Sequence, residues 1–271
     1  MAIIDDRGVA LWAESTGSGP PVVLTGGFGL LHNQFDKVRP LLAPHVRVID
    51  WNYRGCGQAD RAWPGGYTLD TWVDDLAVIL DALKVEQAAF WATSTGSRLA
   101  IRFAARHPGR VTRLMTYPTF RMARSGAGNR DVFADLGETY GYEALGRMFQ
   151  WLGCGETNVW SAKGNEIAQY EAACFARNFT IAQMRDVLNI FSQSDLSADV
   201  ARLKMPTAIL IGASGRLGAE APNNRESIAA FKRLCPQTEV ITVPDAGGTY
   251  CMIEEPERTA ALALPWLKGG E

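Results

Sequence analysis

The stretch Phe90-Trp91-Ala92-Thr93-Ser94-Thr95-Gly96-Ser97 decides the fold, because it leads from an apolar run through a serine between small residues into a helical pattern. Small neighbours let the backbone turn tightly, and such a turn exposes the serine oxygen at the end of a strand. Ala92 and Gly96 stand where the pattern G-x-S-x-G has its two glycines. The five-residue pattern alone is common by chance, so the strand before it and the helix after it make it informative. We therefore predict a strand–turn–helix unit with Ser94 at its tip.

Short apolar runs alternate with amphipathic segments on both sides of this unit, which predicts an α/β fold with a mostly parallel central sheet flanked by helices. Helical spacing of apolar residues is clearest in Thr68–Leu83, and Ser97–Arg106 and Arg225–Leu234 show similar patterns. The runs that we predict as strands are Val9–Ala13, Pro21–Leu24, Val46–Trp51, Ala88–Ala92, Arg113–Tyr117, Thr207–Ile211 and Glu239–Val243.

Residues 121–191 interrupt this alternation, because they contain helical patterns and no convincing strand. A helical insert of this kind commonly lies over the sheet as a lid and shapes the pocket, although packing far from any site is the simpler alternative. We predict a core of residues 1–120 and 192–271 with the insert as a helical cap. The helices expected in the cap are Asp131–Leu152, Lys163–Arg177 and Ile181–Phe191.

The composition of the 271 residues is that of a globular protein, with 47% hydrophobic and 21% charged residues. The 27 basic and 29 acidic residues give a net charge of −2, and no basic stripe indicates a nucleic-acid partner. Five scattered cysteines without a C-x-x-C pair, no signal-like N-terminus and no long apolar run favour a cytoplasmic protein away from membranes. Three isolated histidines favour no metal site, and we expect no cofactor. The expected partner is a small molecule, and a homodimer stays open.

A glycine-rich loop, Leu24-Thr25-Gly26-Gly27-Phe28-Gly29, directly follows a predicted strand. Backbone N–H groups in such a loop can point at an oxyanion, and the donors here would be those of Phe28 and Thr95. With Gly27 and Thr93, these residues form the candidate oxyanion and substrate-binding group. An ordinary strand-to-helix turn that needs glycine is the alternative.

Several stretches of the chain follow one another in a familiar order: GGFG, VRVIDWNYRGCGQAD, YTLDTWVDDLAVILDALKVEQAAFWATSTGS, AARHPGRVTRLM, LKMPTAILIGASG and PDAGGTYCMIEEPE. Through them the chain resembles the α/β-hydrolase superfamily over nearly its whole length, in the manner of esterases, haloperoxidase-like proteins and C–C hydrolases with a helical cap. This resemblance implies the α/β-hydrolase fold and a catalytic serine, acid and histidine in that chain order.

The sequence departs from the family pattern at the residues that would activate the serine. Ser94 matches the nucleophile, but Gly215 stands at the position of the acid and Gly248 at that of the histidine. Gly26 and Asn52 replace a histidine and an aspartate that the family often carries. A serine hydroxyl without a base is a poor nucleophile, so ester or amide hydrolysis by the usual route is not expected.

Three other side chains are candidates for proton transfer or substrate binding near Ser94. His32 follows the glycine-rich loop by a few residues and either faces the pocket or merely begins a helix. Asp245 and Tyr250 flank Gly248, and Tyr250 either donates a proton or packs in the core. The candidate catalytic residues are therefore Ser94, His32 and Tyr250.

These observations leave three hypotheses open. The first is an enzyme with a degenerate triad, repurposed for addition, cyclisation, isomerisation or C–C bond formation or cleavage on a small apolar metabolite. Natural-product biosynthesis is one setting for such chemistry. The second is a non-catalytic ligand-binding protein of the same fold, and the third is a Ser94-dependent esterase with an unconventional base such as His32.

Overall fold

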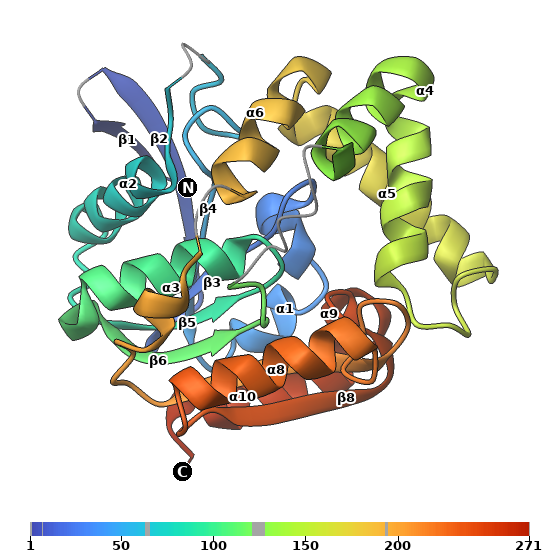
Figure 1. Cartoon of the computed structure of the whole chain (residues 1–271). Coiled ribbons are helices and arrows are strands. Elements are labelled where there is room, and N and C mark those ends of the chain that lie inside the picture. The colour runs from blue at the N-terminus through green and yellow to red at the C-terminus, as the bar shows by residue number, and fades with distance from the viewer. Residues whose placement is uncertain (1, 7, 63–65, 121–127, 193–194, 271) are drawn as a thin grey trace.

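The computed structural model describes residues 2–6, 8–62, 66–120, 128–192 and 195–270, and these contain one sheet of eight strands. The strand order is β1-β2-β4-β3-β5-β6-β7-β8; β2 is antiparallel to β1 and β4, and the other neighbours are parallel (Figure 1). The strands are β1 (Ala2–Asp6), β2 (Val9–Thr16), β3 (Pro21–Thr25), β4 (Arg47–Trp51), β5 (Ala88–Ala92), β6 (Val111–Thr116), β7 (Thr207–Ser214) and β8 (Glu239–Gly247).

Every predicted strand is present, with ends that shift by a few residues, and β1 was not predicted. The helices that we predicted in the core correspond to α2, α3 and α8. The helices are α1 (Arg39–Leu42), α2 (Leu69–Ala82), α3 (Gly96–Arg106), α4 (Gly128–Gly153), α5 (Ala162–Asn178), α6 (Ile181–Ser192), α7 (Ser197–Val200), α8 (Pro222–Leu234), α9 (Cys251–Glu254) and α10 (Pro256–Lys268), with short 3-10 helices η1 (Leu31–Phe35) and η2 (Pro108–Arg110).

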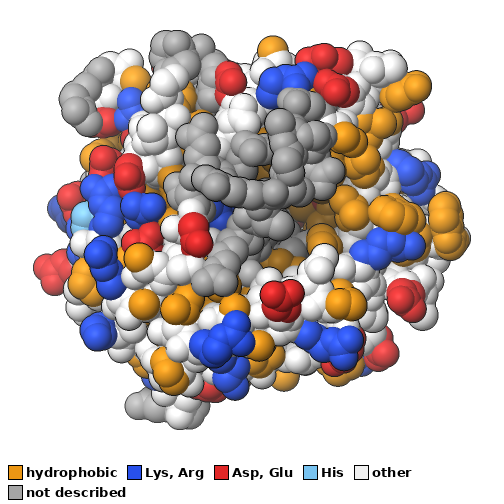
Figure 2. Space-filling model, in the orientation of Figure 1, with side chains coloured by type: hydrophobic (Ala, Val, Ile, Leu, Met, Phe, Trp, Pro, Cys, Tyr) orange, Lys and Arg blue, Asp and Glu red, His pale blue; other side chains and the backbone are white. Residues whose placement is uncertain are grey.

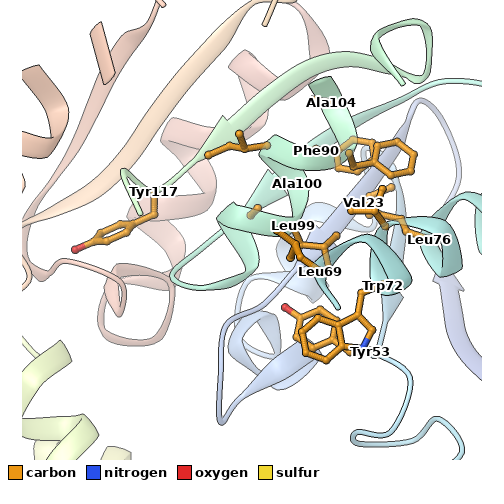
Figure 3. Close-up of a cluster of buried hydrophobic side chains, with 14 of the residues drawn as sticks. Val23, Tyr53, Leu69, Trp72, Leu76, Phe90, Leu99, Ala100, Ala104 and Tyr117 are labelled. Atoms are coloured by element: carbon orange, nitrogen blue, oxygen red, sulfur yellow. The ribbon is translucent and has the colours of Figure 1, made fainter. Parts of the chain in front are cut away.

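The sheet is buried on both faces, because successive strand residues enter two separate hydrophobic clusters. On β3, Val23 belongs to the cluster that contains Trp72 of α2 and Leu99 of α3, and Figure 3 shows these side chains together. Its neighbour Val22 belongs to the cluster that contains Ala263 of α10. Alternation of side chains along a strand explains this division, and burial on both faces explains why the strands read as continuous apolar runs.

In the described chain between β6 and β7, the helices α4, α5 and α6 come before the short α7, and α4 packs against α5 and α6 (Figure 1). They correspond to the helices predicted for the cap, whose first residues, 121–127, lie outside the described part of the chain. The first helix differs from the prediction, because Gly141 has a non-helical backbone conformation and interrupts α4. Glycine reaches this positive φ without the clash that a Cβ would cause.

The surface carries charges of both signs. On the face in Figure 2, Lys and Arg side chains are interspersed with Asp and Glu side chains. Among the described residues, no helix is both long and apolar enough to cross a bilayer. All five cysteines are buried and free of disulfide bonds.

The carboxylate of Glu254, at the end of α9, joins the chain that follows α4 to the sheet. It accepts hydrogen bonds from the Gly247 N–H at the end of β8 (2.6 Å), from the Gly155 N–H after α4 (3.0 Å) and from Asn158 Nδ2 (2.7 Å). Glu254 is 2% exposed, so these donors replace the water that an exposed carboxylate would bind. This carboxylate therefore holds the chain after α4 against the carboxyl end of the sheet.

We predict that Glu254→Gln lowers the free energy of unfolding by on the order of 2 kcal/mol, because the amide removes a charged acceptor from buried donors. Urea unfolding of the variant and of wild type measures this difference. Glu257→Gln is the matched control, since Glu257 is exposed on α10. Equal losses in the two variants would contradict the role that we assign to Glu254.

Candidate functional site

Ser94 lies in a tight turn between β5 and α3, as the sequence predicts. Its φ of 51° is in the left-handed region, which costs a non-glycine residue roughly 1–3 kcal/mol. Its side chain approaches the glycine-rich loop so closely that a Cβ on Gly27 would lie 2.7 Å from the Ser94 Cβ. Only glycine fits at position 27, and the loop and the serine turn therefore form one unit.

The glycine-rich loop differs from the expected oxyanion site in one respect. The Phe28 N–H, expected to face an oxyanion, donates a hydrogen bond of 2.7 Å to Thr95 Oγ1. The Gly27 N–H donates to Gln34 Oε1 (2.8 Å), and Gln34 Nε2 donates to the carbonyl oxygen of Thr249 (3.1 Å). In this conformation the Gln34 side chain occupies the Gly27 N–H and the Thr95 hydroxyl occupies the Phe28 N–H. The Thr95 hydroxyl is turned toward the loop and does not cap α3.

Ser94 lines a small cavity of about 60 Å³ beneath the helices α4 and α5. Pockets for drug-sized ligands measure about 300–1,000 Å³, so this cavity has room only for a few atoms. Phe149, Leu152 and Gly153 of α4 and Glu171 of α5 line it, so these helices cover the serine. The remaining lining residues belong to the core and are Phe28, Leu30, Gln34, Leu217, Thr249 and Tyr250.

Glu171 is the ionisable carboxyl in this cavity, and it is 1% exposed. Its Oε1 accepts a hydrogen bond from the Tyr250 hydroxyl, while its Oε2 has no hydrogen-bond partner among the described residues. Burial raises the pKa of Glu171 well above its usual value, because a charged carboxylate is costly away from water. Tyr250, 4% exposed, packs its ring against Gly153. The cavity thus combines a serine, a phenol and a buried carboxyl.

Gly215 and Gly248 follow the ends of β7 and β8, and backbone fills the space beside both. A Cβ on Gly248 would lie 1.6 Å from the carbonyl oxygen of Leu217. A Cβ on Gly215, whose φ is +80°, would lie 2.4 Å from the carbonyl oxygen of Cys154. Atoms cannot approach this closely, so neither position has room for an acid or an imidazole side chain.

We predict that Gly248→Ala lowers the free energy of unfolding by about 3 kcal/mol or more, because the new methyl group forces the Leu217 backbone to move. Thermal or urea unfolding measures the loss. Gly109→Ala is the matched control, because a Cβ there meets nothing within 4 Å. A Gly248→Ala protein as stable as the control would contradict this prediction, because the Leu217 backbone would then have moved aside at little cost in free energy.

His32 lies on η1, where its ring packs against Trp12 at 4.7 Å between centroids. Asn52 Nδ2 donates to His32 Nδ1 (2.8 Å) and to the carbonyl of Trp51, while Asn52 Oδ1 accepts from the Gln58 N–H. These contacts fix the orientation of the amide, so Nδ1 is the acceptor and the proton of the neutral ring is on Nε2. His32 is not among the residues that line the Ser94 cavity.

Burial lowers the pKa of His32 from 6.5 to about 4, because the charged ring would lose its hydration. The folded pKa is below the unfolded one, so the stability that this group contributes is complete above pH 6.5 and is lost as the pH falls toward 4. The loss amounts to on the order of 3 kcal/mol.

We therefore predict that wild type loses about 3 kcal/mol more than His32→Phe in free energy of unfolding when the pH falls from 7 to 4. The phenyl ring keeps the contact with Trp12 but cannot take up a proton. Urea unfolding at both pH values measures the difference, with His45→Phe as the control, because His45 is exposed. Parallel losses in wild type and His32→Phe would contradict the assignment.

The other candidate residues lie at different distances from the cavity. Thr93 is 3% exposed and does not line it; its N–H donates to the carbonyl of Thr25 (3.1 Å) and joins β5 to β3. Asp245 points to the surface and pairs with Arg258 at 3.3 Å. Of the candidates, the structure brings Ser94, Phe28 and Tyr250 to the cavity, with Gly27 and Thr95 in contact with this group.

The described residues contain no cluster of His, Cys, Asp and Glu suited to a metal ion.

Two side chains that form hydrogen bonds in the cavity, those of Glu171 and Gln34, were among the lining residues that the sequence did not predict. Glu171 carried one usable signal, since it shares a helical face with the apolar residues Ile167, Cys174 and Phe175. A carboxyl on an apolar helix face is rarely structural unless it is paired. Gln34 carried no comparable signal, because its two partners become neighbours only in the folded chain.

Comparison with known proteins agrees with this fold. The family model for the alpha/beta hydrolase fold matches residues 20–144. The AB hydrolase superfamily protein YisY of Bacillus subtilis is 28% identical, over 94% of each chain. A 2-hydroxymuconate semialdehyde hydrolase of a Pseudomonas species is 36% identical over 111 residues, which are 40% of this chain and 39% of that one. Among solved structures, an enol-lactonase from Burkholderia xenovorans has a TM-score of 0.81 at 20% identity, covering 97% of this chain and 98% of that one.

The strand order, the serine turn between β5 and α3 and these matches identify the architecture as the α/β-hydrolase fold. Over 94% of its length the chain is similar to a protein of the α/β-hydrolase superfamily.

Proposed function

We propose that the chain is an enzyme that acts on a small, largely apolar molecule in the Ser94 cavity without a Ser–His–acid triad. The observation that carries this proposal is the Leu217 backbone beside Gly248, since a Cβ at that position would lie 1.6 Å from a carbonyl oxygen. The triad histidine is absent, and the space beside Gly248 is filled. Ser94 nevertheless keeps its strained turn, which supports a retained role for the site.

Residues 121–191 act in this proposal as a cap that closes over the substrate. The cavity of about 60 Å³ accommodates the reacting end of a molecule, so the rest of the substrate requires movement of α4 or α5. Reactions that need orientation and one proton transfer fit such a site: addition, cyclisation, isomerisation, or formation or cleavage of a C–C bond. The partial relative named for 2-hydroxymuconate semialdehyde supports a small-molecule substrate.

The proposal predicts that Ser94 is not a reactive nucleophile. We expect a fluorophosphonate and the smaller methanesulfonyl fluoride to leave Ser94 unlabelled, as measured by mass spectrometry of the intact protein. We also expect p-nitrophenyl acetate hydrolysis to differ by less than about tenfold between wild type and Ser94→Ala, because a serine without a base is a poor nucleophile.

A triad-containing esterase provides the positive control for both reagents. Labelling or hydrolysis that disappears in Ser94→Ala would overturn the proposal and favour a Ser94-dependent hydrolase. Loss of that labelling in His32→Phe as well would identify His32 as its base.

A non-catalytic ligand-binding protein is the second candidate, and the hydrogen bond from the Phe28 N–H to Thr95 Oγ1 favours it. An oxyanion donor that is already occupied cannot stabilise charge on a substrate unless the threonine moves. A ligand that binds tightly and is recovered unchanged after long incubation would support this candidate over the enzyme.

A further inference from the structure

We propose that Glu171 and Tyr250 form a proton-donating pair, which presents a neutral carboxylic acid to a carbonyl oxygen of a substrate held above Ser94. This inference rests on the proposed function, because it assigns a proton donor to the same cavity. It also names the substrate class, a neutral ketone, aldehyde or lactone. Neither residue belongs to the serine–acid–histidine arrangement of the fold.

The position of Glu171 is the first argument. Its carboxyl enters the cavity from α5, 1% exposed, and its Oε2 is buried without a hydrogen-bond partner among the described residues. A buried polar atom without a partner costs roughly 1–3 kcal/mol. Such a cost is understandable where a substrate atom completes the hydrogen bond.

The surroundings of Glu171 are the second argument, because the titratable groups of the described residues that face it are neutral. They are the Tyr250 phenol, the Cys154 thiol after α4 and the Cys174 thiol on α5. Burial raises the pKa of both thiols, and no salt bridge holds Glu171 among the described residues. A carboxyl in such surroundings keeps its proton at neutral pH and is therefore a hydrogen-bond donor.

The Tyr250 hydroxyl determines which oxygen of the Glu171 carboxyl carries the proton. It donates to Oε1, so the acidic proton belongs on the free oxygen, Oε2. When negative charge develops on a substrate oxygen, the Oε2–H bond breaks and a new O–H bond forms on the substrate. The remaining carboxylate is stabilised by the Tyr250 hydroxyl, and it regains a proton from water when the product leaves.

The lining of the cavity selects the substrate class. Phe28, Leu30, Phe149, Leu152 and Leu217 are apolar, and no Lys, Arg or His of the described part of the chain lines the cavity. An anionic group would therefore lack a counter-charge, whereas a neutral carbonyl needs only a donor. The Phe28 N–H already donates to Thr95 Oγ1, and the Glu171 carboxyl supplies a donor that can polarise the carbonyl in its place.

Infrared difference spectroscopy tests the pair without the natural substrate. At about pH 7, where an exposed glutamate is ionised, we expect the C=O band of a buried protonated carboxyl. The band should vanish in Glu171→Gln and remain in Glu166→Gln, the control on the exposed side of α5. In Tyr250→Phe it should persist to higher pH, because the carboxylate has lost a hydrogen-bond donor.

The probe for the substrate class is cyclopentanone. We expect its carbonyl stretch to fall in frequency on binding to wild type and Glu166→Gln, and to fall clearly less on binding to Glu171→Gln, because an amide N–H is a weaker donor than a carboxylic acid. Absence of the carboxyl band at neutral pH, or the same carbonyl frequency with wild type and Glu171→Gln, would overturn the proposal.

These readouts are independent of Ser94 chemistry. If Ser94 proves reactive toward the fluorophosphonate while the band and the frequency shift are found, the proposed function fails and the Glu171–Tyr250 pair stands. If Ser94 is inert and the band is absent, the pair fails and the proposed function stands.

Discussion

The buried carboxylate of Glu254 is the interaction on which the arrangement of the site depends. Through the N–H groups of Gly155 and Gly247 it holds the chain after α4 directly on the end of β8. The backbone of residues 153–155 then passes so close to Gly215 and Gly247 that neither could carry a side chain. The Glu254 carboxylate thus fixes the end of α4 over the sheet, and the backbone that it holds there fills the space beside Gly215.

The interior of the site follows from this closure. Because α4 and α5 lie over the end of the sheet, their residues Phe149, Leu152 and Glu171 line the cavity beside Ser94. They leave space there for only a few atoms. Water is largely excluded, and this raises the cost of any charge there. The same burial that keeps the Glu171 carboxyl neutral makes the hydrogen bonds inside the cavity stronger than those at the surface.

The sequence predicted the parts of the molecule that depend on local patterns. The predicted strands, the helices α2, α3 and α8 of the core and the helices of the insert were found from apolar runs and apolar periodicity, whereas α10 was not predicted. β1 was missed because its residues, AIIDD, are partly exposed and lack a buried run. His32 seemed close to the loop along the chain, but the tight turn of η1 directs its ring to Trp12 and Asn52.

The cavity itself depends on contacts between distant segments, which no local pattern contains. The Phe28 N–H and the Thr95 hydroxyl are separated by 67 positions, and Glu171 and Tyr250 by 79. Glycines at 215 and 248 led us to predict that a triad acid and a triad histidine are missing there. Only the fold shows that backbone fills the space beside both positions.

The glycine at 248 also bears on how this protein could change over evolutionary time. The position of a Cβ is set by the backbone, so no choice of rotamer would relieve the collision of a histidine there with Leu217. Replacing the two glycines alone therefore cannot place a triad acid and a triad histidine at these positions. Such side chains would require a rearrangement of the chain around Leu217 and Cys154. In evolutionary terms, the backbone here restricts which side chains single substitutions can introduce.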